Sequence, residues 1–338
     1  MITIWKDILY SIFVFFLSIT FWQYSREEKW LSNNWVLFGF VLANVWLLRH
    51  NGMVVALGSL LFLFIFALSR RKFIKPLIKS SLFLFLYLIL IKGPVYSIFG
   101  VKENITQPFS VVFLHPLAAH VTNHTEMTPS EEKILDLIHP LDDWTYNCYD
   151  ATVFLYKGFN VEVLQRYSTF LLKTILRLSI SNPSVTLNHL FCQSSFIWNP
   201  IHPSGVMFES VYLQSSADYP NWEKYATIVS PDTRFPSGLY FFRKITADWL
   251  DIDHYKITLR PALYLFSMLT SFLIFSIRNR TPIAFIALMP IFFQIASIAF
   301  TYQYQGIRYV YPIYISALFF VPYFFIQFLL TKLKRFES

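Results

Sequence analysis

Residues 35–68 read WVLFGFVLANVWLLRHNGMVVALGSLLFLFIFAL, and this stretch decides the fold class of the chain. Two long apolar runs, 35–48 and 53–68, flank the polar turn Arg49-His50-Asn51-Gly52. The pattern predicts two membrane helices that reverse direction at Asn-Gly, a dipeptide typical of turns. Ionisable groups at a membrane boundary are costly unless water or a ligand reaches them, so Arg49 and His50 are either plain loop residues or functional ones.

The composition agrees with a membrane protein. The 338 residues include 55% hydrophobic, 20% aromatic and only 14% charged side chains. Soluble proteins carry roughly 25% charged residues, so a soluble domain is excluded. The net charge of +8 reports on the loops of a membrane protein, and we expect no nucleic-acid partner. Cys148 and Cys192 are too few for a structural zinc site, and they either pair or stay as free thiols.

Hydropathy over windows of about 20 residues predicts an all-α polytopic membrane protein with about seven transmembrane helices. The predicted spans are 8–24, 35–49, 52–69, 80–98, 258–277, 282–301 and 308–331. The polar segment between the fourth and fifth spans holds most of the acidic residues. The predicted domains are therefore four membrane spans in 1–99, a mostly helical extracytoplasmic domain in 100–256 and three spans in 257–338.

The basic residues of the short loops assign a side to each loop. They form four clusters, which are Arg26 with Lys29, then Arg70, Arg71, Lys72, Lys75 and Lys79, then Arg278 with Arg280, and finally Lys332, Lys334 and Arg335. With seven spans all four clusters fall on one side, which the positive-inside rule makes the cytoplasm. We expect a multi-pass protein of the cell membrane with its N-terminus and the 100–256 region outside and its C-terminus inside.

The same arrangement puts Asp7 and the turns that hold Arg49 and Arg308 outside, where arginine is disfavoured. These two exceptions motivate a functional hypothesis for both arginines. A chain whose first helix runs inward without a leader is also an unusual insertion product. We expect either further membrane helices upstream, in a longer protein, or a short tail that is translocated easily.

Three helices are expected in the polar region. Thr128-Pro129-Ser130-Glu131 reads as a capping box and predicts a helix over 129–139. Apolar residues at helical spacing predict an amphipathic helix over 161–179, which ends at Asn182-Pro183 and suits packing along the bilayer interface. A further helix is expected over 184–196.

Four polar side chains on the outer side are candidates for chemistry. Asp7 is either the N-terminal cap of the first span or a base or metal ligand at the membrane surface. Arg308, in the turn before the last span, is either part of an interfacial anchor belt or a phosphate clamp. Arg49 supports the same phosphate reading, because a guanidinium binds phosphate oxygens in bidentate fashion, and His50 lies beside it.

The polar region holds further candidates. His115, His120, His124 and His139 are the densest histidine group, but their spacing matches no helical metal motif. Asp142, Asp143 and Asp150 flank aromatic residues, which suits either contacts to a sugar or acceptor or a solvated loop. Ionisable residues are nearly absent from the cores of the spans, with Lys92 the main exception, which argues against an ion-coupled transporter.

The stretch Leu47-Leu48-Arg49-His50-Asn51-Gly52 resembles an uncharacterised family of bacterial polytopic membrane proteins that is grouped with the GT-C type glycosyltransferases. The similarity continues at Lys6-Asp7, at Asn182-Pro183 and at Arg308-Tyr309, and it covers nearly the whole chain. The resemblance implies an enzyme that moves a sugar from a polyprenyl-phosphate carrier to a cell-envelope acceptor on the outer membrane face. It assigns Asp7 and His50 to catalysis and Arg49 and Arg308 to the carrier phosphate, with a divalent metal as an open question.

The chain departs from the family because it resembles only the C-terminal part of such an enzyme. GT-C enzymes generally begin with a span and an outer loop that carries the principal acidic motif. The resemblance therefore implies a shortened member, a split protein with an upstream membrane subunit, or an inactive remnant. The alternatives are a non-catalytic subunit, scaffold or transport component for envelope polysaccharide, and a polysaccharide polymerase.

Overall fold

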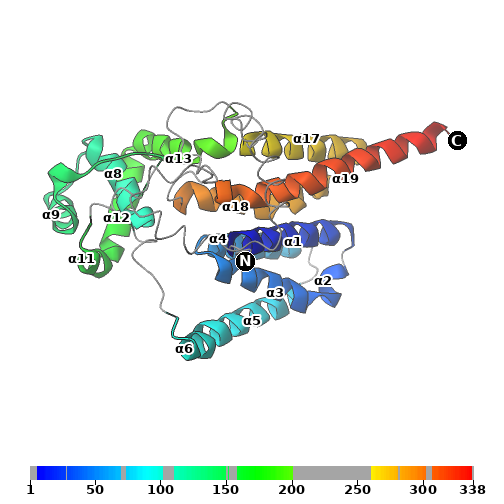
Figure 1. Ribbon diagram of the computed structural model, residues 1–338, viewed down its shortest axis with the longest axis horizontal. Coiled ribbons are helices and arrows are strands. Elements are labelled where there is room, and N and C mark those ends of the chain that lie inside the picture. Colours follow the sequence, from blue (N-terminus) through cyan, green and yellow to red (C-terminus); the bar gives the residue numbers. More distant parts are fainter. Residues whose placement is uncertain are drawn as a thin grey trace, which may run out of the picture.

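The computed structural model describes residues 6–27, 29–69, 74–101, 110–149, 151, 158–200, 260–280, 282–301 and 307–336. The regular elements within these residues are all helical, as the sequence predicts, and these residues contain no β-strand. Figure 1 shows a bundle of long helices with a group of shorter helices gathered at one end.

Among the described residues, six helical segments are long and apolar enough to cross a membrane. They are Lys6–Arg26, Gly52–Ser69, Ile74–Ile98, Pro261–Asn279, Ala284–Thr301 and Tyr311–Leu330. The helix Trp35–Leu48 is apolar but has 14 residues, whereas a span takes about 20. These segments fit the predicted multi-pass membrane protein, and the count of seven spans stays a prediction that depends on this short helix.

The bundle is built from both ends of the chain. Its N-terminal elements are α1 (Lys6–Arg26), α2 (Trp30–Asn33), α3 (Trp35–Leu48), α4 (Gly52–Ser69) and α5 (Ile74–Leu90), which continues through a π-helical turn, η1 (Ile91–Val95), into α6 (Tyr96–Ile98). Its C-terminal elements are α17 (Pro261–Asn279), η5 (Pro282–Leu288), α18 (Met289–Thr301), η6 (Ile307–Val310) and α19 (Tyr311–Phe336).

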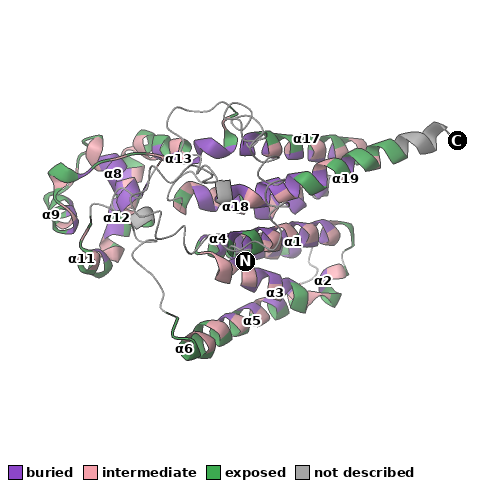
Figure 2. Cartoon of the chain, in the orientation of Figure 1, coloured by how far each residue is buried: buried purple, intermediate pink, exposed green. Residues whose placement is uncertain are grey.

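Helix α1 lies at the centre of this bundle. It packs against α3 on one side and against α18, η5 and α19 on the other. Its residues Val14, Leu17 and Phe21 follow one another at helical spacing and are fully buried. Figure 2 shows that burial concentrates where the long helices face one another, while the outer faces are exposed, as expected of helices surrounded by lipid.

Close helix contacts depend on small residues. A side chain on Gly39 of α3 would place its Cβ 2.8 Å from the carbonyl oxygen of Ser80 in α5. The hydroxyl of Ser80 in turn donates a hydrogen bond to the carbonyl of Trp35 over 2.9 Å. Membrane helices associate through such small-residue contacts and interhelical hydrogen bonds, since lipid provides no hydrophobic drive between them.

The shorter helices form what we call the helical cap. It consists of η2 (Ser110–Leu114), α8 (His115–Thr122), α9 (Pro129–Ile138), η3 (Leu141–Asp143), α11 (Val161–Arg166) and α12 (Ser168–Ser181). Helix α13 (Pro183–Trp198) leads from the cap to the bundle, where it packs against α17 and α18. The cap has its own apolar core, separate from that of the bundle.

The predicted elements of the cap are largely confirmed. Helix α9 begins at Pro129 and is closed by the expected capping box, in which Thr128 and Glu131 exchange hydrogen bonds. The single helix expected over 161–179 is instead two helices, because Tyr167 leaves the helical region at φ −102° and ψ 13°. The helix expected over 184–196 is α13, which is longer by a few residues.

Candidate functional site

The carboxylate of Asp7 and the guanidinium of Arg49 form an ion pair at one end of the bundle, with Oδ1 and Nη1 2.5 Å apart. Asp7 lies in the first turn of α1, and Arg49 follows the last residue of α3 in an extended conformation that ends the helix. The side chains are only 4% and 9% exposed, respectively. A buried pair of opposite charges avoids the high cost of leaving either charge alone in a low-dielectric environment.

Two aromatic rings enclose the guanidinium. Its central carbon lies 4.1 Å from the ring centroid of Tyr309 and 5.7 Å from that of Tyr10. A cation over an aromatic face is stabilised by the negative charge at the centre of the ring, more strongly when water is excluded. Arg49 is therefore held by one carboxylate and two rings, from α1 and η6.

A chain of buried hydrogen bonds extends this cluster into α18. The hydroxyl of Tyr10 donates to Oε1 of Gln294, and Nε2 of Gln294 donates to the carbonyl of Tyr309 over 3.1 Å. Nδ2 of Asn51 donates to Oγ of Ser297 over 3.3 Å, and this Oγ donates to the carbonyl of Gln294. The network joins α1, the α3–α4 turn, α18 and η6, so it orders the end of the bundle around Arg49.

Gly52 lets α3 and α4 meet at this turn. A Cβ on Gly52 would lie 1.9 Å from the carbonyl oxygen of Val45, which is impossible without backbone movement. From the sequence alone, Gly52 is predicted only to help form the turn. The structure adds that its missing side chain allows the close approach that positions Arg49.

The predicted site residues divide into those that meet and those that do not. Asp7 and Arg49 are in contact, and His50 is exposed beside them in the same turn. Arg308 lies in η6 next to Tyr309, but its side chain is outside the described part of the structure. Asp142 and Asp143 are exposed in η3 of the helical cap, away from this cluster, and Asp150 lies outside the described residues.

Sequence reasoning missed five members of the cluster: Tyr10, Asn51, Gln294, Ser297 and Tyr309. A signal was present in α18, because Gln294 and Ser297 are polar residues one turn apart inside an otherwise apolar helix. Polar groups within a membrane span face the bundle interior and find partners there. The partners themselves come from other helices, and the local pattern does not identify them.

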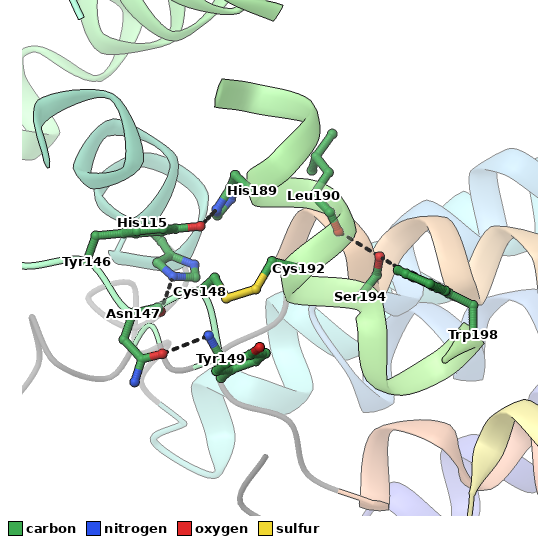
Figure 3. The surroundings of a disulfide bond; sticks show 10 residues. All are labelled: His115, Tyr146, Asn147, Cys148, Tyr149, His189, Leu190, Cys192, Ser194 and Trp198. Carbon is green, nitrogen blue, oxygen red and sulfur yellow. Dashed lines mark hydrogen bonds between the residues drawn. A yellow bond between two sulfur atoms is a disulfide. The ribbon is translucent and has the colours of Figure 1, made fainter. Parts of the chain in front are cut away.

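A second polar cluster lies in the helical cap around His115, Tyr146 and His189 (Figure 3). The hydroxyl of Tyr146 lies 2.9 Å from Nδ1 of His189, and Nε2 of His115 donates to the carbonyl of Asn147 over 2.9 Å. The two imidazole rings meet edge to face with centroids 4.7 Å apart. Burial, with the neighbouring His115 and His120, lowers the pKa of His189 to about 3, so this ring is neutral.

The other histidines take different positions. His120 is buried and contacts Thr125 and Thr186 through its two ring nitrogens, and burial lowers its pKa. His124 is exposed, and His139 follows the last residue of α9. In the described part of the chain no group of three or more histidine, cysteine, aspartate or glutamate side chains could hold a metal ion.

A disulfide joins Cys148 to Cys192, whose Cα atoms are 5.8 Å apart (Figure 3). The sequence left pairing and free thiols as alternatives, and the structure selects pairing. Cys148 follows Tyr146 by two residues, and Cys192 lies one turn after His189 on α13. The bond therefore ties the loop with Tyr146 to the helix that packs against the membrane bundle.

No protein-family model, no curated protein and no solved structure matches this chain. The resemblance to GT-C type glycosyltransferases accordingly stays a prediction from the sequence motifs.

Proposed function

We propose that the chain is a membrane glycosyltransferase of the GT-C-like type. It transfers a sugar from a polyprenyl-phosphate carrier to a glycan, lipid or protein acceptor of the cell envelope, on the outer face of the membrane. The observation that carries this proposal is the ion pair of Asp7 and Arg49, which lie 42 positions apart and meet at one end of a membrane bundle. A carboxylate beside a guanidinium at the end of apolar helices has the two groups that chemistry on a lipid-linked phosphate needs.

In this proposal Asp7 acts as the acid or base, or as a metal ligand, and Arg49 holds the carrier phosphate together with Arg308. A guanidinium has five N–H donors, and the contact with Asp7 occupies Nη1, so the fork can engage a second anion. The rings of Tyr10 and Tyr309 keep the guanidinium in place while partners exchange. His50 orients the substrate from the exposed turn, and Asp142, Asp143 and Asp150, which are remote from Arg49 in the chain, are left for contacts to the acceptor.

The proposal is tested with the full chain in lipid vesicles. The assay measures transfer of labelled sugar from a panel of synthetic polyprenyl-phosphate donors. The informative variants are Asp7→Asn, which keeps the size of the side chain, and Arg49→Lys, which keeps the charge but loses the planar fork. We expect Asp7→Asn to lower transfer by about 10²–10⁴-fold if the carboxylate is the acid or base. Unchanged transfer by Asp7→Asn, in protein that elutes like the wild type, contradicts its role.

Arg177→Lys is the matched control, because Arg177 pairs with Glu131 in the helical cap and has no assigned role in transfer. It is expected to leave transfer unchanged. Assays with and without a chelator decide whether a divalent metal takes part.

One observation favours a second candidate, a non-catalytic subunit, scaffold or transport component for envelope polysaccharide. Arg49 is already engaged by Asp7 and two tyrosine rings, an arrangement that also suits a purely structural tie. Thermal stabilisation of the purified chain by polyprenyl phosphate separates the two, because only a carrier-binding protein gains stability from the ligand. A polysaccharide polymerase binds the same carrier, and it is distinguished by the growth of a chain instead of a single transfer.

A further inference from the structure

Helix α12 has two apolar faces, of which the helical cap uses one. Leu171 and Leu178 are fully buried in the core of the cap. Most of the apolar residues of the predicted amphipathic segment 161–179, such as Leu164, belong to this core, and packing of the segment along the bilayer interface stays a prediction. A different ridge points outward, made of Leu172, Leu176 and Ile180, which are 48%, 55% and 81% exposed. Positions four apart lie on one side of a helix, so the three side chains form a continuous ridge.

Helix α13 carries a second outward ridge. Leu187, Phe191 and Trp198 are exposed, and their spacing of four and seven residues keeps them on one side of the helix. The rings of Phe191 and Trp198 approach edge to face at 6.1 Å. The opposite side is buried, and its residues Phe196 and Ile197 belong to the core of the membrane bundle.

Helix α13 leads toward a helix whose outer side is also apolar. Helix α13 packs against α17, and Figure 1 shows it running on toward that helix. Helix α17 exposes large apolar residues of its own, including Leu263 and Phe266 near its first turn. Since α17 is one of the candidate spans, α13 packs beside a helix that is long and apolar enough to cross a membrane.

The charged side chains that α12 itself carries are both basic. Lys173 is exposed next to the α12 ridge, and neither α12 nor α13 contains an aspartate or a glutamate. The guanidinium of Arg177 is partly exposed and pairs with Glu131 of α9. Apolar ridges with a lysine and without acidic residues match the outer layer of a bilayer, where lysine stems reach toward phosphate groups and tryptophan lies at the boundary.

We propose that α12 and α13 bind the surface of the lipid bilayer through these two ridges. Helix α12 lies in the headgroup boundary, and α13 lies in the adjacent part of the acyl layer, alongside α17. The helical cap is thereby held flat on the membrane over the end of the bundle. This inference is independent of the proposed transfer reaction, because it rests on α12, α13 and α17 and uses neither Asp7 nor Arg49.

The test uses an environment-sensitive fluorophore on single introduced cysteines. The two native cysteines form the disulfide, so an introduced cysteine is the one free thiol. Leu176→Cys, Ile180→Cys and Phe191→Cys probe the ridges, and Glu132→Cys on the exposed side of α9 is the control. The full chain is reconstituted in vesicles that contain anionic lipid, and quenching is measured with nitroxide-labelled lipids and with aqueous iodide.

We expect lipid nitroxides to quench the three ridge positions and to place the α12 probes at a depth of about 5–10 Å. Iodide should quench only the control. Strong iodide quenching at positions 176 and 180 overturns the proposal, since the ridge then faces water. Shielding from both quenchers overturns it as well, since protein then covers the ridge. A non-reducing gel that shows the intact disulfide verifies that each variant is folded.

The attraction of Lys173 to anionic headgroups is tested by adding Lys173→Glu to the Ile180→Cys variant. We expect weaker lipid quenching at position 180 and unchanged quenching for the same substitution in the Phe191→Cys background. Equal quenching at position 180 with and without Lys173 overturns the attraction of α12 to anionic headgroups.

Discussion

The guanidinium of Arg49 meets the carboxylate of Asp7 at 2.5 Å, and the two residues come from different helices 42 positions apart. Both side chains are nearly buried at one end of the bundle. Around this pair α1, the turn between α3 and α4, α18 and η6 come together.

Breaking the pair from one side should destabilise the protein. Asp7→Ala or Arg49→Ala leaves a buried charge without its partner, which costs about 3–5 kcal/mol. Thermal unfolding in detergent, followed by size-exclusion chromatography, measures the loss. The double variant should be no less stable than either single variant. Additive losses from the two substitutions would show that the side chains do not depend on each other.

Gly52→Ala should be one of the more damaging small substitutions in the chain. Its methyl group would collide with the carbonyl of Val45, and overpacking of this kind costs about 1–3 kcal/mol or more. Gly93→Ala is the matched control, because a Cβ on Gly93 meets nothing within 4 Å. We expect a lower melting temperature for Gly52→Ala and an unchanged or higher one for Gly93→Ala. Similar melting temperatures for the two variants would contradict the close approach of α3 and α4.

Acid should loosen the helical cap through His189. Its pKa is about 3 in the folded chain and near 6.5 when unfolded, so the unfolded state binds more protons between these values. The contribution of neutral His189 is complete above about pH 6.5 and is lost progressively as the pH falls toward 3. We expect hydrogen exchange in α8 and α13, corrected for its intrinsic pH dependence, to accelerate across this window.

His189→Gln should flatten this pH dependence, because glutamine does not titrate. His124→Asn is the control, since His124 is exposed and its positive φ of 50° suits asparagine. The same pH dependence in His189→Gln as in the wild type would assign the effect to other groups.

The disulfide should hold the cap on the bundle. Cys148 and Cys192 close a chain segment with a separation of 44, for which a disulfide contributes about 2–4 kcal/mol. Reduction, or the double variant Cys148→Ser and Cys192→Ser, should speed limited proteolysis in the cap while the membrane spans stay protected. Equal digestion with and without the bond would contradict this role.

The all-helical membrane class could be predicted from the sequence because each membrane helix is a continuous run of apolar residues, which is a local signal. A run such as 53–68 is apolar along its whole length, and α4 forms over Gly52–Ser69. The capping box at Thr128 likewise places the start of α9 to the residue. Such signals arise from neighbours in the chain, so no knowledge of the tertiary structure is needed.

Only some members of the candidate site could be predicted from such local signals. Asp7, Arg49 and His50 stood out as polar residues at the ends of apolar runs. The pairing of Asp7 with Arg49 joins two helices 42 positions apart, and the contacts with Gln294 and Tyr309 join segments separated by more than 250 residues. The amphipathic pattern over 161–179 was similarly ambiguous, because it does not say whether an apolar face meets a protein core or a bilayer.

The sequence by itself determined that the chain is a helical membrane protein and where most of the predicted helices lie, because hydrophobicity and capping act over one or two turns. Only the tertiary structure decided that Arg49 pairs with Asp7 and that Cys148 pairs with Cys192. It also decided that Leu171 faces the core of the cap while Leu176 faces outward. These outcomes depend on which helix surfaces pack together, and packing selects among partners that local sequence leaves equivalent.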